Sequence, residues 1–498
     1  YDLIFSEPSN PYRAGIASLY TKEFYQACKQ RLNPGGIFLQ WCQAYEVDAR
    51  TVRTVYATLA SVYPHIQTWW TQSGDLLLMG SVEPLVYDVG MMRGRCGEYP
   101  YKEAISKVWR VTDLEGVLSH QIANAQFAAS VAKVEAEEGV LNSDDTNIVE
   151  FAFARSVGTR SPFGPSTVLA TAAALGQTRP MITNGTVDWG RVQDRRVSYF
   201  ASEGRQPNLG PGAPQDRRAR AQMFTALLQS NPRGALEAWG QQGPQGRGPE
   251  DLTELVFLAN AYNEVASDDA LPLIERIRQV SPIEADALLA HLNWKQQKAP
   301  EALEAIQRAF TGYRRDPWPD NDLMRRTLTL AAHMAQADLK GNFAQLLFDA
   351  LDQPFALSLL DEARLRAQLD IARRVDALVP NSRLRLKVLQ KFEPYVPWER
   401  RFLTVRLEAY DQANHPDADR AAKELDAFLS AEPFPFDTNL MPARPATRPA
   451  TGPATGPTTG PTTVPMLTPG KDAEPTDALD AKDPTLTEGG TPADTGKR

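Results

Sequence analysis

The sequence predicts an α/β sheet followed by an all-α solenoid and a disordered tail. Three observations support this fold class. Short apolar runs alternate with stretches of helical periodicity over residues 1–155, and residues 216–432 are almost continuously patterned for helices. From residue 433 to residue 498 the chain is rich in Pro, Thr, Ala and Gly, and no aromatic residue follows Phe436. Such a segment buries too little apolar surface to fold.

Composition excludes several classes of protein. The 498 residues allow about two to four domains, and the net charge of −8 argues against a broad nucleic-acid surface. The three cysteines lack CxxC spacing and form an odd, sparse set, so neither a disulfide framework nor a zinc site is expected. The five histidines are scattered, and we expect no metal site. No apolar run reaches the roughly 18 to 20 residues that span a bilayer.

The first region divides into six elements. "YDLIF" predicts a buried parallel strand, and "TKEFYQACKQRL" predicts a helix with Thr21 as its N-cap, ended by "NPGG". "GIFLQW" predicts the next strand, "DARTVRTVYATLASVYP" a second helix, and "IQTWWTQSGDLLLMGS" two strands about a turn at Ser73. The order β-α-β-α-β-β is half of a doubly wound sheet that ends in a hairpin.

Ligands of such sheets lie beyond the carboxyl ends of the strands. The segments that follow the first two strands, Ser6–Gly15 and Gln40–Glu46, are therefore the candidate site loops. A Gly-rich cofactor turn normally follows the first strand of the complete sheet, and we expect it ahead of Tyr1. Residues 156–215, which hold one predicted helix in "SPFGPSTVLATAAALG", are predicted to be a linker.

The residues "YDLIFSEPSNPYRAGIASLYTKEFYQACKQRLNPGGIFLQWCQAYE" resemble the spermidine synthase-like branch of the class I methyltransferase fold, the polyamine aminopropyltransferases. An acidic residue and a short Pro-containing loop end the strand, and "SLY", "EFY" and "NPGG" follow. "LNSDDTNIVEFAFAR", at 141–155, is similar to the ending of a bacterial branch whose synthase-like domain follows a membrane-spanning segment. The resemblance implies that residues 1–155 are the carboxyl-terminal part of a Rossmann-like catalytic domain.

This resemblance implies transfer of an aminopropyl group from decarboxylated S-adenosylmethionine to a diamine such as putrescine, without a metal. Glu7 falls on the family's catalytic acidic position, where a carboxylate can take the proton of the attacking ammonium. The resemblance places substrate contacts at Ser9, Asn10, Gln40, Gln43, Trp69 and Trp70. Asn10 stands where the soluble synthases carry a second Asp, and an amide lacks the negative charge that attracts a dication. The half that binds the co-substrate is expected ahead of Tyr1.

Several of these residues also have a structural interpretation. Glu7 and Asn10 each precede a proline, as residues at turns commonly do. Trp69 and Trp70 alternate in a strand, so one is expected to pack in the core and only the other to face a ligand. The carboxylates at Asp144 and its neighbour resemble an acid/base pair, but "NSDD" is also a good N-cap and turn.

Residues 216–432 predict antiparallel helix pairs. "LTELVFLANAYNEVA" and "DDALPLIERIRQVSP" align with "EADALLAHLNWKQQK" and "APEALEAIQRAFTGYRRDP" at an offset of about 31 to 32 residues, close to the tetratricopeptide period. Leu258 then falls on Leu289, and Ala270 on Ala302. A degenerate tetratricopeptide-like solenoid would bind a protein or peptide on its concave face. The alternative is that the array is a spacer or only packs against the first domain.

Three functions remain open at this point. The first is spermidine synthase-like aminopropyl transfer within polyamine biosynthesis. The second is a non-enzymatic scaffold that keeps a degenerate synthase-like domain and binds a protein on its repeats. The third is an S-adenosylmethionine-dependent methyltransferase, because "NPGG" and an acid-plus-Pro loop occur there as well. We expect a cytoplasmic protein without a nucleic-acid partner, tethered to the inner membrane if a membrane segment precedes Tyr1.

Overall fold

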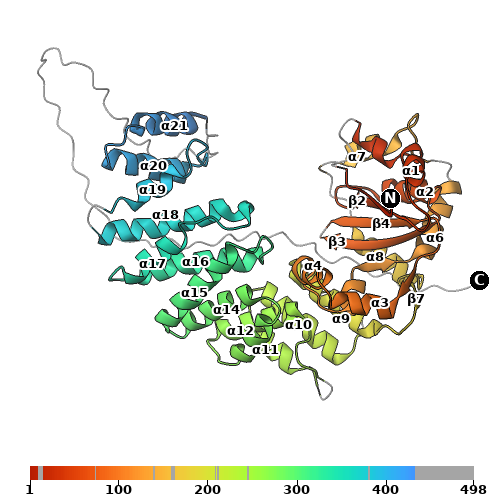
Figure 1. Cartoon of the computed structure of the whole chain (residues 1–498), viewed down its shortest axis with the longest axis horizontal. Helices are drawn as coiled ribbons and strands as arrows, with labels where there is room; N and C mark the ends of the chain where they lie inside the picture. Colours follow the sequence, from red (N-terminus) through yellow and green to blue (C-terminus); the bar gives the residue numbers. More distant parts are fainter. Residues whose placement is uncertain are drawn as a thin grey trace, which may run out of the picture. The chain divides into compact units, whose positions relative to one another are not determined.

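The computed structural model describes residues 1–8, 15–72, 74–137, 141–156, 158, 163–207, 209, 212–243, 246–379 and 382–431. Residues Tyr1–Ala431 form one compact unit, a sheet with helices followed by a succession of helices (Figure 1). The tail predicted from residue 433 onward lies outside the described residues. The elements of the α/β part are β1 (Leu3–Ser6), η1 (Ile16–Tyr20), α1 (Lys22–Lys29), β2 (Ile37–Gln43), α2 (Ala49–Ala60), β3 (His65–Gln72), β4 (Asp75–Ser81), β5 (Val86–Asp88), α3 (Val89–Cys96), α4 (Tyr101–Val108), α5 (Leu114–Leu118), β6 (Gln121–Ala123), α6 (Ala125–Glu137), α7 (Ile148–Ser156), α8 (Pro165–Ala174), β7 (Met181–Thr183) and α9 (Trp189–Ser202).

The main sheet is mixed and has the order β1-β2-β4-β3-β6. β1 and β2 are parallel and joined through α1, whereas the hairpin β3–β4 folds back so that β4 pairs antiparallel with both β2 and β3. The predicted order β-α-β-α-β-β is confirmed from β1 to β4, with the short 3-10 helix η1 added between β1 and α1. Because β1 and β2 run the same way, their carboxyl ends lie at the same edge of the sheet.

Local signals account for where the helices begin. The Thr21 hydroxyl accepts a hydrogen bond from the Phe24 amide at 3.3 Å, so Thr21 is the N-cap of α1, as predicted. Asp48 plays the same part for α2 and accepts from the Thr51 amide at 2.9 Å. Gly35 has a φ of 76°, the left-handed conformation that lets the chain turn from α1 into β2.

One strand differs from its prediction. The apolar run of β1 suggested burial on both faces, but Leu3 is 54% exposed and Phe5 is 52% exposed. The reason is topological: β1 is an edge strand, and β2 is its one partner among the described residues. An uncovered edge with apolar side chains is a surface that another strand or chain can pair with.

The interval 156–215 contains more structure than the one helix expected there. That helix is α8, and it is followed by β7 and by the helix α9. β7 pairs in parallel with β5, and Tyr199 of α9 joins the apolar core of the sheet. The segment predicted as a linker therefore contributes to the packing of the α/β part.

Among the described residues after α9, the regular elements are all helices. They are α10 (Gln215–Leu228), α11 (Pro232–Gly240), α12 (Leu252–Glu264), α13 (Ala270–Arg278), α14 (Pro282–Lys295), α15 (Ala299–Tyr313), α16 (Asn321–Ala337), α17 (Asn342–Ala350), η2 (Ser358–Leu360), α18 (Asp361–Leu378), α19 (Leu384–Gln390), α20 (Arg400–Gln412) and α21 (Ala418–Ala431). Successive helices pack on one another in the order of the chain (Figure 1). The predicted pairs are α12–α13 and α14–α15, and both Ala270 and Ala302 are fully buried where the helices meet.

Ion pairs attach the helical array to the α/β part. Lys107 in α4 pairs with Asp316, which follows α15. Arg110 contacts Glu284 of α14 at 2.7 Å and Asp320 at 3.3 Å, and both Arg110 and Glu284 are largely buried. Partly buried charges are screened less than surface charges, so these pairs restrain the array more than an exposed salt bridge would.

Gly312 tests the close packing of α14 on α15. A Cβ at this position would lie 2.5 Å from the Ile283 Cγ1 atom, so an added methyl group forces the side chain or helix to shift. We expect Gly312→Ala to lower the free energy of unfolding by about 1 to 3 kcal/mol, because overpacking outweighs the better helix propensity of Ala. Urea denaturation followed by circular dichroism measures the change. The control is Gly240→Ala in α11, where the added methyl meets no atom within 4 Å and should be neutral or stabilising.

Candidate functional site

Glu7 follows β1 directly at the carboxyl edge of the sheet. The register pairs Ser6 with Gln40, so Glu7 emerges one residue beyond the last paired position of the two parallel strands. Its side chain is exposed, whereas Pro8 is buried and fixes the exit of the chain. Ser9 and Asn10, the other residues expected in this loop, lie outside the described residues.

The segment "LNSDD" lies against the region that follows β1. The Asn142 side chain donates to the Ala17 carbonyl at 3.5 Å and accepts from the Val149 amide at 3.1 Å, and Asn142 is fully buried. The Asn142 carbonyl accepts from the Lys22 amide at 3.0 Å. Asp144 is tied to the same helix, since its amide donates to the Glu23 carboxylate at 3.0 Å. A segment more than a hundred residues away thus packs on the helices that follow the β1 loop, and its Asn142 amide also donates to the Thr58 hydroxyl in the last turn of α2 at 3.0 Å.

Gln40 and Gln43 do not present their amide donors to solvent. Both side chains are fully buried. The Gln40 Nε2 donates to the Trp41 carbonyl at 2.8 Å, and the Gln43 Nε2 donates to the Tyr45 carbonyl at 2.7 Å. Their amide oxygens are buried without a hydrogen-bond partner among the described residues. A buried polar atom without a hydrogen-bond partner is costly. The two amide oxygens are therefore the atoms of these side chains that could still accept a hydrogen bond.

Trp69 and Trp70 pack on opposite faces of the sheet. Trp69 stacks on Trp109 with ring centroids 6.2 Å apart, in the cluster that includes α3 and α5. Trp70 packs against Phe200 at 4.9 Å, and its ring already carries the Arg205 guanidinium at 4.9 Å. Both indoles are almost completely buried. The protein's own arginine occupies the Trp70 face that a ligand ammonium would use.

His120 sits beside these tryptophans and is fully buried. Its Nδ1 lies 2.9 Å from the Trp70 carbonyl oxygen, which can only accept, so the Nδ1 carries the proton. The imidazole stacks on Trp109 at 4.1 Å, and Nε2 has no partner among the described residues. Burial, together with the nearby Arg196 charge, lowers the pKa of His120 to about 3. The imidazole is therefore neutral at physiological pH.

Acid is expected to destabilise the protein through His120. The pKa of the histidine side chain is 6.5 in the unfolded chain and about 3 in the folded protein. At pH values between these two, the imidazole is protonated in the unfolded chain but neutral in the folded protein. This contribution to stability is complete above about pH 6.5 and is lost as the pH falls. Between about pH 7.5 and about pH 5 it amounts to about 2 kcal/mol, measurable as the pH dependence of urea denaturation.

The matched variant for this prediction is His120→Gln, whose amide still has a donor for the Trp70 carbonyl but does not titrate. Its stability should vary less steeply with pH than that of the wild type. His291, whose pKa burial also lowers to about 3, is present in both proteins and cancels in the comparison. An identical pH slope for the two proteins would mean that His120 is not the titrating group.

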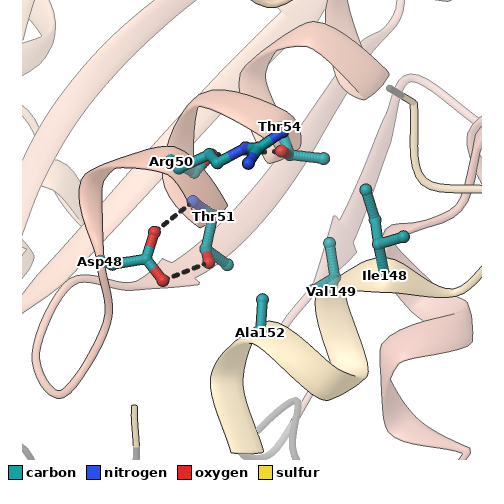
Figure 2. A pocket seen from close by; sticks show the side chains of 7 residues that line it. All are labelled: Asp48, Arg50, Thr51, Thr54, Ile148, Val149 and Ala152. Atoms are coloured by element: carbon teal, nitrogen blue, oxygen red, sulfur yellow. Dashed lines mark hydrogen bonds between the residues drawn. The ribbon is translucent and has the colours of Figure 1, made fainter. Parts of the chain in front are cut away.

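A pocket of about 190 Å³ opens where α7 faces the first turns of α2, just after β2 (Figure 2). The Asp48 carboxylate on its polar wall accepts from both the amide and the hydroxyl of Thr51, each at 2.9 Å. Val149 and Ala152 of α7 form the apolar wall opposite. The Asp48 carboxylate already accepts the hydrogen bonds that cap α2, so it is a structural group. We therefore do not assign it the role of a catalytic base in this pocket.

A metal site, a membrane-spanning helix and similarity to known proteins were each considered as guides to function. Within the described residues, no group of three or more His, Cys, Asp or Glu side chains is placed to hold a metal ion. No helix in that part of the chain combines the length and apolarity needed to cross a bilayer. No protein-family model matches this chain, and no solved structure is significantly similar to it.

Proposed function

We propose that this chain carries the acceptor side of an aminopropyltransferase site, with Glu7 as its base. The nitrogen of a diamine attacks the carbon next to the sulfonium of decarboxylated S-adenosylmethionine. The new C–N bond forms as the C–S bond breaks, and methylthioadenosine leaves. The amine proton passes to the Glu7 carboxylate, because a protonated amine has no lone pair with which to attack.

The observation that carries this proposal is the packing of a second, distant motif segment on the helices that follow the Glu7 loop. The motif segments around Glu7 and Asn142 were both singled out by sequence resemblance, and hydrogen bonds tie the second of them to Ala17 and Lys22. The parallel pair of β1 and β2, with the hairpin β3–β4 beside it, gives the edge at which ligands of doubly wound sheets bind. Glu7 is the exposed carboxylate at that edge in the β1 loop.

A scaffold is the second candidate, and a specific observation favours it. Gln40, Gln43, Trp69 and Trp70 would contact the substrate in an active member of the family, but here all four are buried. The side-chain nitrogens of Gln40, Gln43 and Trp70 donate within the protein itself, as in the Trp70 Nε1 that donates to the Gln72 carbonyl at 2.7 Å. In this alternative the sheet is a retained fold, and the helical array attached by Lys107 and Arg110 binds a protein partner.

Nucleoside binding separates the two candidates. The test uses the full protein as its gene encodes it, titrated by calorimetry with decarboxylated S-adenosylmethionine and, separately, with S-adenosylmethionine. Preferential binding of the decarboxylated form, followed by turnover of putrescine, supports aminopropyl transfer. Preferential binding of S-adenosylmethionine supports a methyltransferase on the same fold. Binding of neither nucleoside rules out both enzymes and leaves the scaffold.

A further inference from the structure

A second concave surface is lined by α8, α9 and the start of α10. Its volume is about 370 Å³, within the range of roughly 300–1,000 Å³ typical of small-ligand pockets. Most of its wall is apolar and comes from Leu169, Val197, Phe200, Ala213 and Pro214. The polar groups that line it are Gln193, Arg196 and Arg217.

Arg196 differs from the other arginines around it. Its Nε donates to the Ser119 carbonyl at 2.8 Å, and its Nη2 donates to the Gln121 carbonyl at 2.9 Å. Its third nitrogen, Nη1, has no acceptor among the described residues, and no carboxylate there pairs with it. By contrast, Arg195 pairs with Asp113 at 2.9 Å and Arg217 pairs with Asp194. Arg196 is thus a cation held by neutral carbonyls alone.

Its surroundings make this charge costly. Arg196 is half-buried, and burial without a compensating anion lowers its pKa from 12.5 to about 10. A guanidinium keeps its proton under these conditions, so the positive charge remains in the pocket wall at physiological pH. An anion placed against Nη1 would recover the electrostatic energy that desolvation has removed.

We propose that this pocket binds an anionic amphiphile, a molecule with one carboxylate or phosphate on an apolar body. The head group pairs with the Arg196 guanidinium and accepts a hydrogen bond from the Gln193 amide nitrogen. The Gln193 amide oxygen already accepts a hydrogen bond from Arg217, but the nitrogen takes no part in that bond. The apolar body lies on Phe200, Val197 and the surface at Ala213. A cationic amphiphile meets the same apolar wall but is repelled by Arg196.

The test compares three probes of equal chain length on the full chain: octanoate, octyl phosphate and octylammonium. Calorimetry should give a dissociation constant below about 1 mM for at least one of the two anions and no binding of the cation. Tighter binding of octanoate identifies a carboxylate head group, and tighter binding of octyl phosphate identifies a phosphate. Absence of binding by both anions, or equal binding of octylammonium, overturns the proposal.

Three variants locate the binding. Arg196→Gln should weaken the preferred anion about 10- to 100-fold, the value of a hydrogen-bonded charge pair. Ala213→Trp fills the pocket from its rim, leaves Arg196 in place, and should abolish binding, so the inference stays testable if Arg196→Gln does not fold. Arg218→Gln is the control, because it removes an equal charge from an exposed position of α10 outside the pocket. Equal affinity in all three variants and the wild type would show that the probe binds elsewhere.

Discussion

Replacing Arg195 by Met should lower the free energy of unfolding by about 3 to 5 kcal/mol, the cost of leaving a buried carboxylate unpaired. The Arg195 side chain is only 2% exposed, and its guanidinium contacts Asp251 at 3.0 Å and Asp113 at 2.9 Å. Each aspartate is also an N-cap, Asp113 of α5 and Asp251 of α12. Met fills a similar volume but leaves the Asp251 carboxylate without an ion-pair partner among the described residues, whereas Asp113 keeps Arg191. Urea denaturation followed by circular dichroism gives the change.

Arg191 provides a matched control on the same helix, one turn before Arg195. It contacts the same Asp113 carboxylate at 2.9 Å, but its side chain is 36% exposed. Solvent-exposed ion pairs contribute about 0 to 1 kcal/mol, so Arg191→Met should change stability little. If Arg195→Met lowers the free energy of unfolding by no more than Arg191→Met does, then burial does not determine how strongly these arginines bind their aspartates.

The same residues show which parts of the fold were predictable. N-caps act within four residues, and Thr21 could therefore be assigned from the sequence alone. Helix pairs repeat along the chain, so aligning the repeats places Ala270 and Ala302 at equivalent positions. Both residues are fully buried in the structure. Arg195 and Asp113 are 82 residues apart, and Arg110 and Glu284 are 174 apart. With 53 basic and 61 acidic residues in the chain, no pattern in sequence selects these pairs.

The candidate site was predictable to a smaller extent. The end of a parallel strand is a sequence feature, and Glu7 lies exposed at that position. The burial of Gln40 and Gln43 depends on helices that pack over the sheet, which strand periodicity does not reveal. One of the two indoles, Trp69 or Trp70, was expected to pack in the core and the other to face a ligand. Instead, Trp69 lies in a cluster formed by β5, α3, α5 and the start of α9, and Trp70 packs against Tyr199 and Phe200 near the end of α9, so both indoles are in the core.

The proposed base makes the largest prediction for activity. In the full protein, Glu7→Gln should lower kcat/KM for putrescine by about 10²- to 10⁴-fold, the usual contribution of a positioned base. Glutamine keeps the length and shape of the side chain but cannot accept the ammonium proton. Since the Glu7 side chain is exposed, the variant should unfold at the same urea concentration as the wild type. Methylthioadenosine release, measured against time at saturating nucleoside, reports the turnover.

Glu83→Gln is the appropriate control, because Glu83 is also an exposed carboxylate but lies at the opposite edge of the sheet. The register establishes this: β4 begins at Asp75 beside Gln43 and ends at Ser81 beside Ile37, so Glu83 follows the end of β4 at the amino-terminal edge of β2. Loss of turnover in Glu7→Gln alone would assign the proton transfer to the loop after β1. Equal turnover in both variants would remove Glu7 from the chemistry. A protein that binds the nucleoside but is indifferent to Glu7 would then need its base from another residue at the same edge.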